Sequence, residues 1–247
     1  MRAAYDEFHA VSSMPGLNLR PENWSSPADW PAEWTQVFYK RYPRAERVEL
    51  SERTALPPMD LADALAARRS ARDPGTTAVT AANTVAVLAA SVGVRHDLAP
   101  SDVGARRAYP SGGARFPVEI YLRFHHVADI ADGLYHYNIV EDDLRVLSRS
   151  AEDEPVFQHI FGFDWITGAR ATVLMTAAFN RSAMKYGERA YRFALLEAGH
   201  LAQNILLTSA ALGLAATPVG GFSDYVGDVY LELEYTDEHL LYAVVLP

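Results

Sequence analysis

The amino-acid sequence predicts an α+β domain in which helices flank a central, mostly antiparallel or mixed sheet. Two observations support this fold class. The expected elements follow the order helices, strands, one long helix and strands again, which differs from the strand–helix alternation of a doubly wound parallel sheet. No linker-like change of composition interrupts residues 58–247. We therefore expect one domain over residues 58–247, preceded by an N-terminal arm over residues 1–57.

Composition narrows the functional class. The 247 residues are 49% apolar and 11% aromatic, enough for a sizeable core. A net charge of −9 argues against nucleic acid or an anionic membrane as the main partner. The absence of cysteine excludes disulfides, thiolate metal sites and a cysteine nucleophile. No apolar run approaches the length of a membrane span and no apolar signal segment opens the chain, so we expect a cytoplasmic protein.

The N-terminal arm is rich in proline and tryptophan. Its tryptophans are Trp24, Trp30 and Trp34, interspersed with Pro21, Pro27, Pro31 and Pro43. Such a segment becomes ordered by laying its aromatic rings on a neighbouring surface. Two interpretations remain open: an arm that only wraps over the domain, and an arm that contacts the substrate.

The first helix of the domain follows Pro57 and Pro58, with Asp60 as its expected N-cap. It ends in the run Arg68-Arg69-Ser70-Ala71-Arg72. Three arginines within five residues repel one another unless an anion lies among them, and guanidinium groups bind phosphate bidentately. A phosphate site is one interpretation of this run. A solvated basic turn at a helix end is the other.

A second helix is predicted over residues 76–94, with Gly93 as its terminator. The segment Tyr109-Pro110-Ser111-Gly112-Gly113-Ala114-Arg115 follows. Adjacent glycines allow backbone N–H groups to approach a flat or anionic ligand closely. The spacing matches neither a Walker loop nor a dinucleotide-binding glycine fingerprint. A ligand-contacting turn and a plain loop both remain possible interpretations.

The middle of the chain predicts strands. Residues 118–124 alternate between apolar and polar side chains, and further strands are expected at 133–138, 144–147, 171–179 and 240–246. Short helices are expected at 154–161 and, as a helix or turn, at 226–233. His125, His126 and His136 lack the spacing of metal ligands, so we expect no metal site there.

Residues 184–222 are the centre of the predicted fold. A cation-rich turn leads into a long Ala/Leu helix that ends at Gly213, and Pro218-Val219-Gly220-Gly221-Phe222 follows a short β-like run. A helix that is apolar over so much of its surface is normally buried in a domain or in a subunit interface. We expect His200 and Asn204 to be interior polar residues, and we expect chemistry at both ends of this helix.

Several of these motifs occur in an order that resembles the nitroreductase-like flavoprotein superfamily. Within it, the chain resembles the SagB-type, or McbC-like, dehydrogenases, which oxidise azolines to azoles in ribosomal peptide natural products. The resemblance covers roughly residues 58–246. It rests on Arg68–Arg72, Tyr109–Arg115, Gly-Leu-Tyr-His-Tyr at 133–137, Lys185-Tyr186-Gly187-Glu188-Arg189 and Gly220-Gly221-Phe222.

The resemblance implies a nitroreductase-like fold and an intertwined homodimer with FMN in two sites, each built from both subunits. It implies FMN contacts from Arg68, Arg69, Ser70 and Arg72, from the partner's Pro110, Ser111, Gly112 and Gly113, and from Gly220 and Gly221 beside the ring. Many such enzymes place a further cation near the C-terminus. Residues 242–247 contain none, so Arg189 and Arg192 are candidate substitutes.

The implied activity is the oxidation of a peptide thiazoline or oxazoline, with hydride transfer to FMN N5. Lys185 and Tyr186 are the implied catalytic pair, with the lysine as base and the tyrosine as its relay. A cyclodehydratase is an implied partner. The alternative is an NAD(P)H-dependent FMN oxidoreductase of the same fold that acts on a small molecule or a carrier-bound substrate. A third hypothesis, a flavin-free binding protein, is disfavoured by the intact arginine–serine and Pro-Ser-Gly-Gly segments.

Overall fold

The computed structural model describes residues 4–13, 30–48, 54–94, 106–149 and 154–247. These residues form a seven-stranded sheet in the order β1-β4-β3-β2-β5-β7-β6, in which neighbouring strands pair antiparallel. The strands are β1 (Arg47–Val48), β2 (Val118–Phe124), β3 (Gly133–Asn138), β4 (Asp143–Ser148), β5 (Ala171–Ala178), β6 (Thr217–Val219) and β7 (Glu238–Leu246). The predicted α+β class is therefore confirmed.

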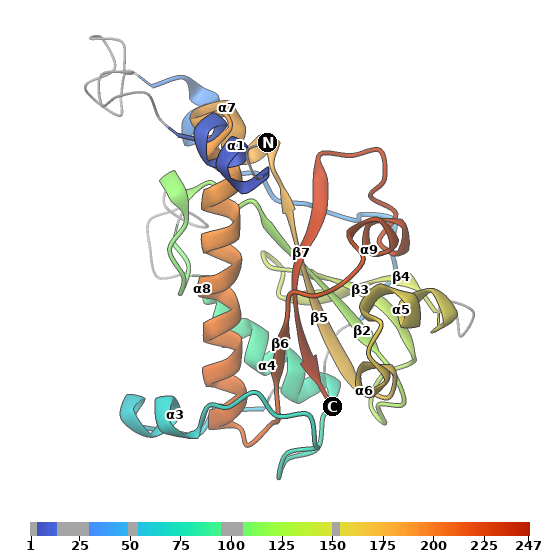
Figure 1. Ribbon diagram of the computed structural model, residues 1–247. Helices are drawn as coiled ribbons and strands as arrows, with labels where there is room; N and C mark the ends of the chain where they lie inside the picture. The colour runs from blue at the N-terminus through green and yellow to red at the C-terminus, as the bar shows by residue number, and fades with distance from the viewer. Residues whose placement is uncertain (1–3, 14–29, 49–53, 95–105, 150–153) are drawn as a thin grey trace.

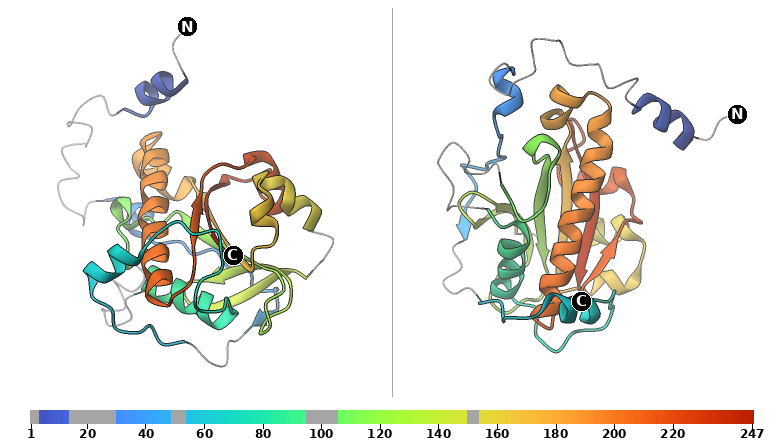
Figure 2. Two further views of the ribbon diagram at one scale, coloured as in Figure 1. Left: turned by 60° about the horizontal axis from the view of Figure 1, so that its bottom comes forward. Right: turned by 90° about the vertical axis from the view of Figure 1, so that its left-hand side faces the viewer.

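Helices cover both faces of the sheet (Figure 1). The helices are α1 (Ala4–Val11), α2 (Ala32–Thr35), α3 (Leu61–Ala67), α4 (Ala81–Val92), α5 (Glu154–Phe161), α6 (Asp164–Thr167), α7 (Asn180–Tyr186), α8 (Arg189–Ala211) and α9 (Asp224–Tyr230). Helix α8 lies lengthwise across one face beside α4, as Figure 2 shows, while α5, α6 and α9 cover the other. In the described part of the chain, no helix is long and apolar enough to span a membrane.

The two helical layers create two apolar clusters, one on each side of the sheet. Leu88 of α4 and Leu201 of α8 pack with one set of alternating strand residues, which includes Ile120. Phe157 of α5 and Ile160 pack with the other set. Because both faces are covered, β2 is buried along its whole length. The predicted alternation is present, but its polar side chains lie inside the protein.

These buried polar side chains form a network of ion pairs that compensates their loss of water. The carboxylate of Glu119 accepts from Arg181 at 2.5 Å and contacts Nε2 of His136 at 2.9 Å. Lys40 of the N-terminal arm pairs with Glu238 at 2.8 Å. The arm residue Lys40 is thus anchored in the domain.

Helix α4 begins later than the sequence predicts. Thr80 is its N-cap, and its hydroxyl oxygen accepts from the backbone N–H of Asn83 at 3.0 Å. The carboxylate of Asp129 accepts from the first two helical N–H groups, at 2.8 and 3.1 Å. The cap satisfies N–H groups in the first turn of a helix that starts at Ala81, which explains why the helix begins there and not at residue 76. Gly93 ends the helix in the left-handed conformation, as predicted.

The cation-rich turn predicted before the long helix includes the end of a short helix, α7. Gly187, with φ +53° and ψ −141°, separates α7 from α8, so that Lys185 and Tyr186 end a short helix of their own. Helix α8 has 23 residues and is therefore about 34 Å long. His200 is exposed, contrary to our expectation. The amide of Asn204 is half-buried and donates to the carbonyls of Ser91 and Ala108 at 3.1 and 3.2 Å.

Candidate active site

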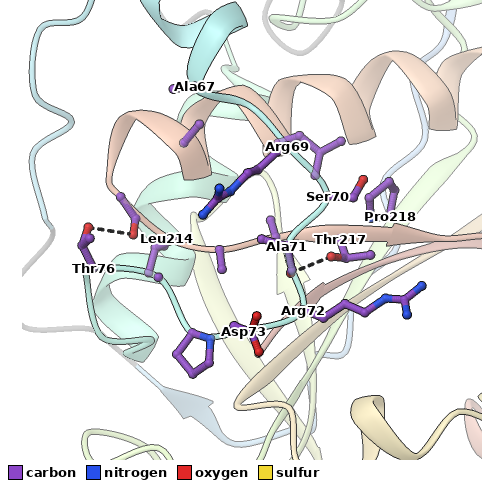
Figure 3. Close-up of a pocket in the computed structure, with 17 residues that line it drawn as sticks. Ala67, Arg69, Ser70, Ala71, Arg72, Asp73, Thr76, Leu214, Thr217 and Pro218 are labelled. Carbon is purple, nitrogen blue, oxygen red and sulfur yellow. Dashed lines mark hydrogen bonds between the residues drawn. The ribbon is translucent and has the colours of Figure 1, made fainter.

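A groove of about 920 Å³ lies at the C-terminal end of α8 (Figure 3). Residues 69–76 form one wall, and residues 213–218 form the other. The two walls are joined by backbone pairing: Ser70 forms a parallel bridge with Ala216, and the N–H of Ala71 donates to the Ala216 carbonyl at 3.3 Å. The hydroxyl of Thr217 donates to the Ala71 carbonyl at 2.7 Å. The arginine–serine run is thus held against the start of β6.

Two glycines allow this close approach. Gly213 has φ +72°, a conformation that favours glycine, and its carbonyl accepts from the N–H of Thr77 at 3.2 Å. A Cβ placed on Gly75 would lie 2.4 Å from the Gly213 carbonyl oxygen. The groove therefore depends on a glycine in each wall.

The groove presents cations to solvent. Arg69 and Arg72 both line it, are exposed, and project in different directions from the backbone in Figure 3. The guanidinium of Arg72 lies 5.1 Å from the centroid of the Trp165 ring. Within the described residues, neither arginine has a carboxylate in a salt bridge. Two such forks with the Ser70 hydroxyl suit a phosphate dianion. Arg68 is half-buried and lies outside the residues that line the groove.

Lys185 and Tyr186 lie at the opposite end of α8, against the glycine pair. Gly113 has φ +61°, and a Cβ there would lie 2.2 Å from Oη of Tyr186 and 3.2 Å from Nζ of Lys185. A Cβ on Gly112 would lie 3.0 Å from the ring of Phe193. The structure therefore brings together the Pro-Ser-Gly-Gly turn and the Lys-Tyr pair of one chain. Only glycine permits this contact.

Side chains behind the turn fix its shape. The N–H of Phe116 donates to Oγ of Ser111 at 2.9 Å. The buried Arg115 donates from Nε to the Arg181 carbonyl and from Nη1 to the Trp34 carbonyl, each at 2.8 Å. The turn is thus attached both to α7 and to the N-terminal arm.

Glu197 is a functional candidate that the sequence analysis missed. Its side chain, 1% exposed, lies on the buried face of α8, and neither oxygen has a well-aligned hydrogen bond among the described residues. Burial raises its pKa to about 7, and the neighbouring Ser111 hydroxyl and Arg107 guanidinium offset only part of this effect. In the sequence, Glu197 could have been recognised only as a single carboxylate within a run of Ala and Leu residues.

Gly220 and Gly221 follow β6 directly, just beyond Pro218, the last residue of the groove wall. Both are exposed. A Cβ on Gly220 would lie 3.5 Å from the ring of Tyr242, and one on Gly221 would lie 3.9 Å from the ring of Phe163. They lie outside the residues that line the groove, and each is backed by an aromatic ring.

Arg189 and Arg192 lie at the other end of α8 from Arg69 and Arg72 of the same chain. Arg192 donates from Nε to Oγ of Ser12 at 2.7 Å and from Nη2 to the His9 carbonyl at 2.6 Å. Arg189 donates to the Ser12 carbonyl at 3.4 Å. Both arginines thus bind the C-terminal end of α1, and a role in phosphate binding stays a prediction.

The three histidines near β2 do not gather at one place. His136 is buried against Glu119, as described above. His125 and His126 face Asp132, with their Nδ1 atoms 3.1 and 3.4 Å from Oδ2. In the described residues, His125, His126 and Asp132 come nearest to a set of metal ligands, and their ligand atoms lie within 4.8 Å of one another.

Comparison with known proteins identifies the family. Residues 65–246 match the sequence profile described as the nitroreductase family. The chain belongs to the nitroreductase family. Membership indicates an FMN-type oxidoreductase.

Three relatives have sequences similar to part of this chain. MJ1384 of Methanocaldococcus jannaschii, assigned as a nitroreductase, is 30% identical over 165 residues, which are 66% of this chain and 80% of the relative. The trifolitoxin-processing protein TfxB of Rhizobium leguminosarum is 29% identical, with 57% of this chain and 39% of TfxB matched. The microcin B17-processing protein McbC of Escherichia coli is 28% identical, with 51% of this chain and 48% of McbC matched. The match thus spans less than half of the two processing proteins.

Solved structures show the same nitroreductase fold. A nitroreductase-like protein from Anabaena variabilis superposes with a TM-score of 0.70 at 21% identity, over 98% of this chain and 45% of that one. A chain of the E. coli microcin synthetase McbBCD, solved with truncated pro-MccB17 bound, superposes with a TM-score of 0.58 at 18% identity, over 98% and 90% of the two chains. At these identities the structures support the fold alone.

Proposed function

We propose that this protein is an FMN-dependent dehydrogenase that oxidises the thiazoline or oxazoline of a peptide to the azole, in natural-product biosynthesis. One observation carries the proposal: α8 presents an arginine-lined groove at one end and a Lys-Tyr pair packed on a Gly-Gly turn at the other. The similarity to TfxB and McbC, both named as processing proteins, supports the choice of substrate class.

The distance between the groove and the Lys-Tyr pair indicates that each site is built from two chains. Within one chain, the groove and the Lys-Tyr pair lie at opposite ends of α8, which is about 34 Å long. A flavin nucleotide is too short to contact both. A two-fold axis across α8 would place the start of one helix beside the end of its partner, so that two identical composite sites form. We therefore propose a homodimer.

The exposed surface of α8 fits this arrangement. Leu195 and Leu196 are 43% and 59% exposed, and a Cβ on the exposed Gly199 would meet no atom within 4 Å. Apolar side chains presented together on a helix surface mark a site of protein contact. The absence of a side chain at Gly199 permits a second helix to approach closely.

The residues in the groove fit FMN. Two guanidinium groups without carboxylate partners in the described residues match its phosphate, and the glycine-edged walls match a flat ring. The proposed contacts are Arg68, Arg69, Ser70, Arg72, Gly220 and Gly221 of one subunit, and Pro110, Ser111, Gly112, Gly113 and Arg189 of the other.

Lys185 and Tyr186 would move the proton. When bound, FMN supplies a hydride acceptor at N5, and molecular oxygen accepts the electrons afterwards. Lys185, in its neutral form, takes the proton from the carbon adjacent to the hydride donor. Tyr186, whose Oη lies over Gly113, donates a hydrogen bond to the azoline nitrogen or relays the proton.

Two substitutions separate binding from chemistry. Lys185→Ala should retain FMN, measured by absorbance near 450 nm, and lose turnover of a thiazoline peptide, because it removes the base alone. Arg72→Ala should lose FMN, whereas Arg149→Ala, which removes an arginine paired with Glu46, should retain it. Normal turnover by the lysine variant would refute its role as base.

Anaerobic mixing with NADPH tests the reaction class. The proposed dehydrogenase draws electrons from its azoline substrate, so its flavin should stay oxidised with NADPH and bleach with a thiazoline peptide. Rapid bleaching by NADPH would favour the alternative NAD(P)H-dependent oxidoreductase. A cyclodehydratase is the proposed partner, supported by the sequence similarity to the microcin B17-processing protein McbC.

A further inference from the structure

The ammonium group of Lys185 lies in a cage of aromatic rings. Nζ is 3.8 Å from the ring centroid of Trp30, 5.7 Å from that of Trp34 and 5.6 Å from that of Tyr186. The Trp30 and Trp34 rings meet edge to face, with centroids 6.3 Å apart. Both tryptophans precede the segment that matches the nitroreductase family, residues 65–246.

Hydrogen bonds fix the arm on either side of the lysine. Nε1 of Trp34 donates to the carbonyl of Met184, the residue before Lys185, at 3.0 Å. The Trp34 carbonyl accepts from Arg115, which also donates to the carbonyl of Arg181. Residues 30–34 are therefore attached to α7 through its backbone and through a buried guanidinium.

The remaining wall of the cage belongs to the glycine turn. The same Nζ lies 3.2 Å from the position of a Cβ on Gly113, and Oη of Tyr186 lies closer still. The rings of Trp30 and Trp34 thus limit where the ammonium group can lie beside the turn that we assign to the flavin. A lysine stem has four rotatable bonds, and the cage restricts them before substrate arrives.

We propose that Trp30 and Trp34 are positioning residues for Lys185, so that the N-terminal arm is part of the active site. The inference rests on the proposed function, in which Lys185 is the base. The Trp30 face attracts the ammonium form of Lys185 more than an aliphatic side chain of similar size would, and its ring still bounds the space open to the neutral amine once the proton is lost. Trp30 holds the lysine end at the turn, and Trp34 holds Trp30 on α7.

The chain offers a direct test, because Lys40 and Lys185 are its only two lysines. Lys40 pairs with Glu238 away from the arm tryptophans and serves as an internal reference. A short pulse of an amine-acylating ester, followed by peptide mass spectrometry, gives the ratio of labelling at Lys185 to labelling at Lys40. The full-length protein is used with FMN as purified.

Trp30→Leu should raise this ratio by about tenfold, whereas Trp30→Phe, which keeps an aromatic face, should stay within about twofold of the parent. Trp34→Phe removes the Nε1 bond to Met184, keeps an aromatic face and should give an intermediate ratio. Phe38→Leu, elsewhere on the arm, is the matched control. Labelling that is unchanged in Trp30→Leu would overturn the proposal.

Turnover separates positioning from packing. Trp30→Leu should lower kcat by about tenfold with little change in KM, and Trp30→Phe should restore it. If Trp30→Leu and Trp30→Phe had the same kcat, Trp30 would act through packing alone. If instead Lys185→Ala turns over normally, the base role fails, while the labelling ratio still decides whether the cage holds the lysine.

Discussion

Glu197 shows how one side chain links α8 to the glycine turn. It lies behind Ser111, near the guanidinium of Arg107, on the buried face of the helix. Arg107 in turn donates to Oη of Tyr109 at 2.6 Å and lies 4.1 Å from the ring centroid of Phe116. A carboxylate with a pKa of about 7 at this position makes the surroundings of the turn sensitive to pH near neutrality.

Stability should depend on the protonation of Glu197. Its pKa of about 7 in the folded chain lies above the ordinary glutamate value of 4.5, so folding favours the protonated form. Stability should fall as pH rises from 4.5 to 7, with the full cost present above 7. Glu197→Gln should remove this loss, on the order of 3 kcal/mol at pH 8 and little at pH 4.5.

Urea unfolding at pH 4.5, 6 and 8 measures this difference. Glu188→Gln, at an exposed position beside α8, is the control and should follow the parent at every pH. A parent and a Glu197→Gln variant whose unfolding free energies change in parallel with pH would contradict the assignment.

Single residues could be predicted where a local motif defines them. Lys185, Tyr186 and Gly113 stand in short recognisable runs, and the structure brings these runs together. Trp30 and Arg115 acquired their roles only through contacts with residues 66 or more positions away, as in the bond from Arg115 to Arg181. Side-chain periodicity contains no information about such pairs.

At the scale of elements, α8 has two apolar faces but only one is covered in the single chain. Leu201 and Ile205 are fully buried against the sheet and α4, whereas Leu195 and Leu196 face outward. Within one chain this outward surface costs free energy, because apolar area stays in contact with water. A partner helix would remove that cost.

Leu196→Glu should therefore convert the proposed dimer to a monomer, because it places a charge in the apolar contact. Sedimentation velocity measures the mass. FMN should be lost at the same time, since each site needs both chains. Val156→Glu, at 40% exposure on α5 across the sheet, is the matched control and should stay dimeric. A Leu196→Glu dimer with full FMN would refute this interface.

Strands were predicted closely, and helix ends were not. The limits of β2 and β3 agree with the prediction, because alternation over six or seven residues is a strong local signal. The start of α4 was misplaced because its cap uses Asp129, which is distant in sequence. The short helix α7 was missed because its residues, Asn180–Tyr186, include few apolar side chains, and the cation-rich run at its end predicts a turn.

At the scale of the whole molecule, a site built from two chains predicts that two inactive variants restore activity when they are combined in one dimer. When Arg72→Ala and Lys185→Ala chains are unfolded together, mixed and refolded with FMN, half of the dimers contain one chain of each kind. In such a dimer one site has both defects and the other has neither, so the mixture should recover about a quarter of wild-type turnover. Each variant refolded alone is the control and should be inactive.

If both halves of each site came from one chain, every site in the mixed dimer would have a defect. The mixture would then stay as inactive as its components. Turnover of the refolded mixture thus decides between a shared and a single-chain site, whatever azoline is used.

The length of α8 has a final consequence. Since α8 sets the spacing between the groove and the Lys-Tyr pair, adding or deleting a single helical turn would shift them by about 5.4 Å and, in the proposed dimer, misalign both sites at once. Insertions are tolerable in the surface connections but not inside this rod. The 23-residue length of α8 would thus fix the geometry of both proposed sites.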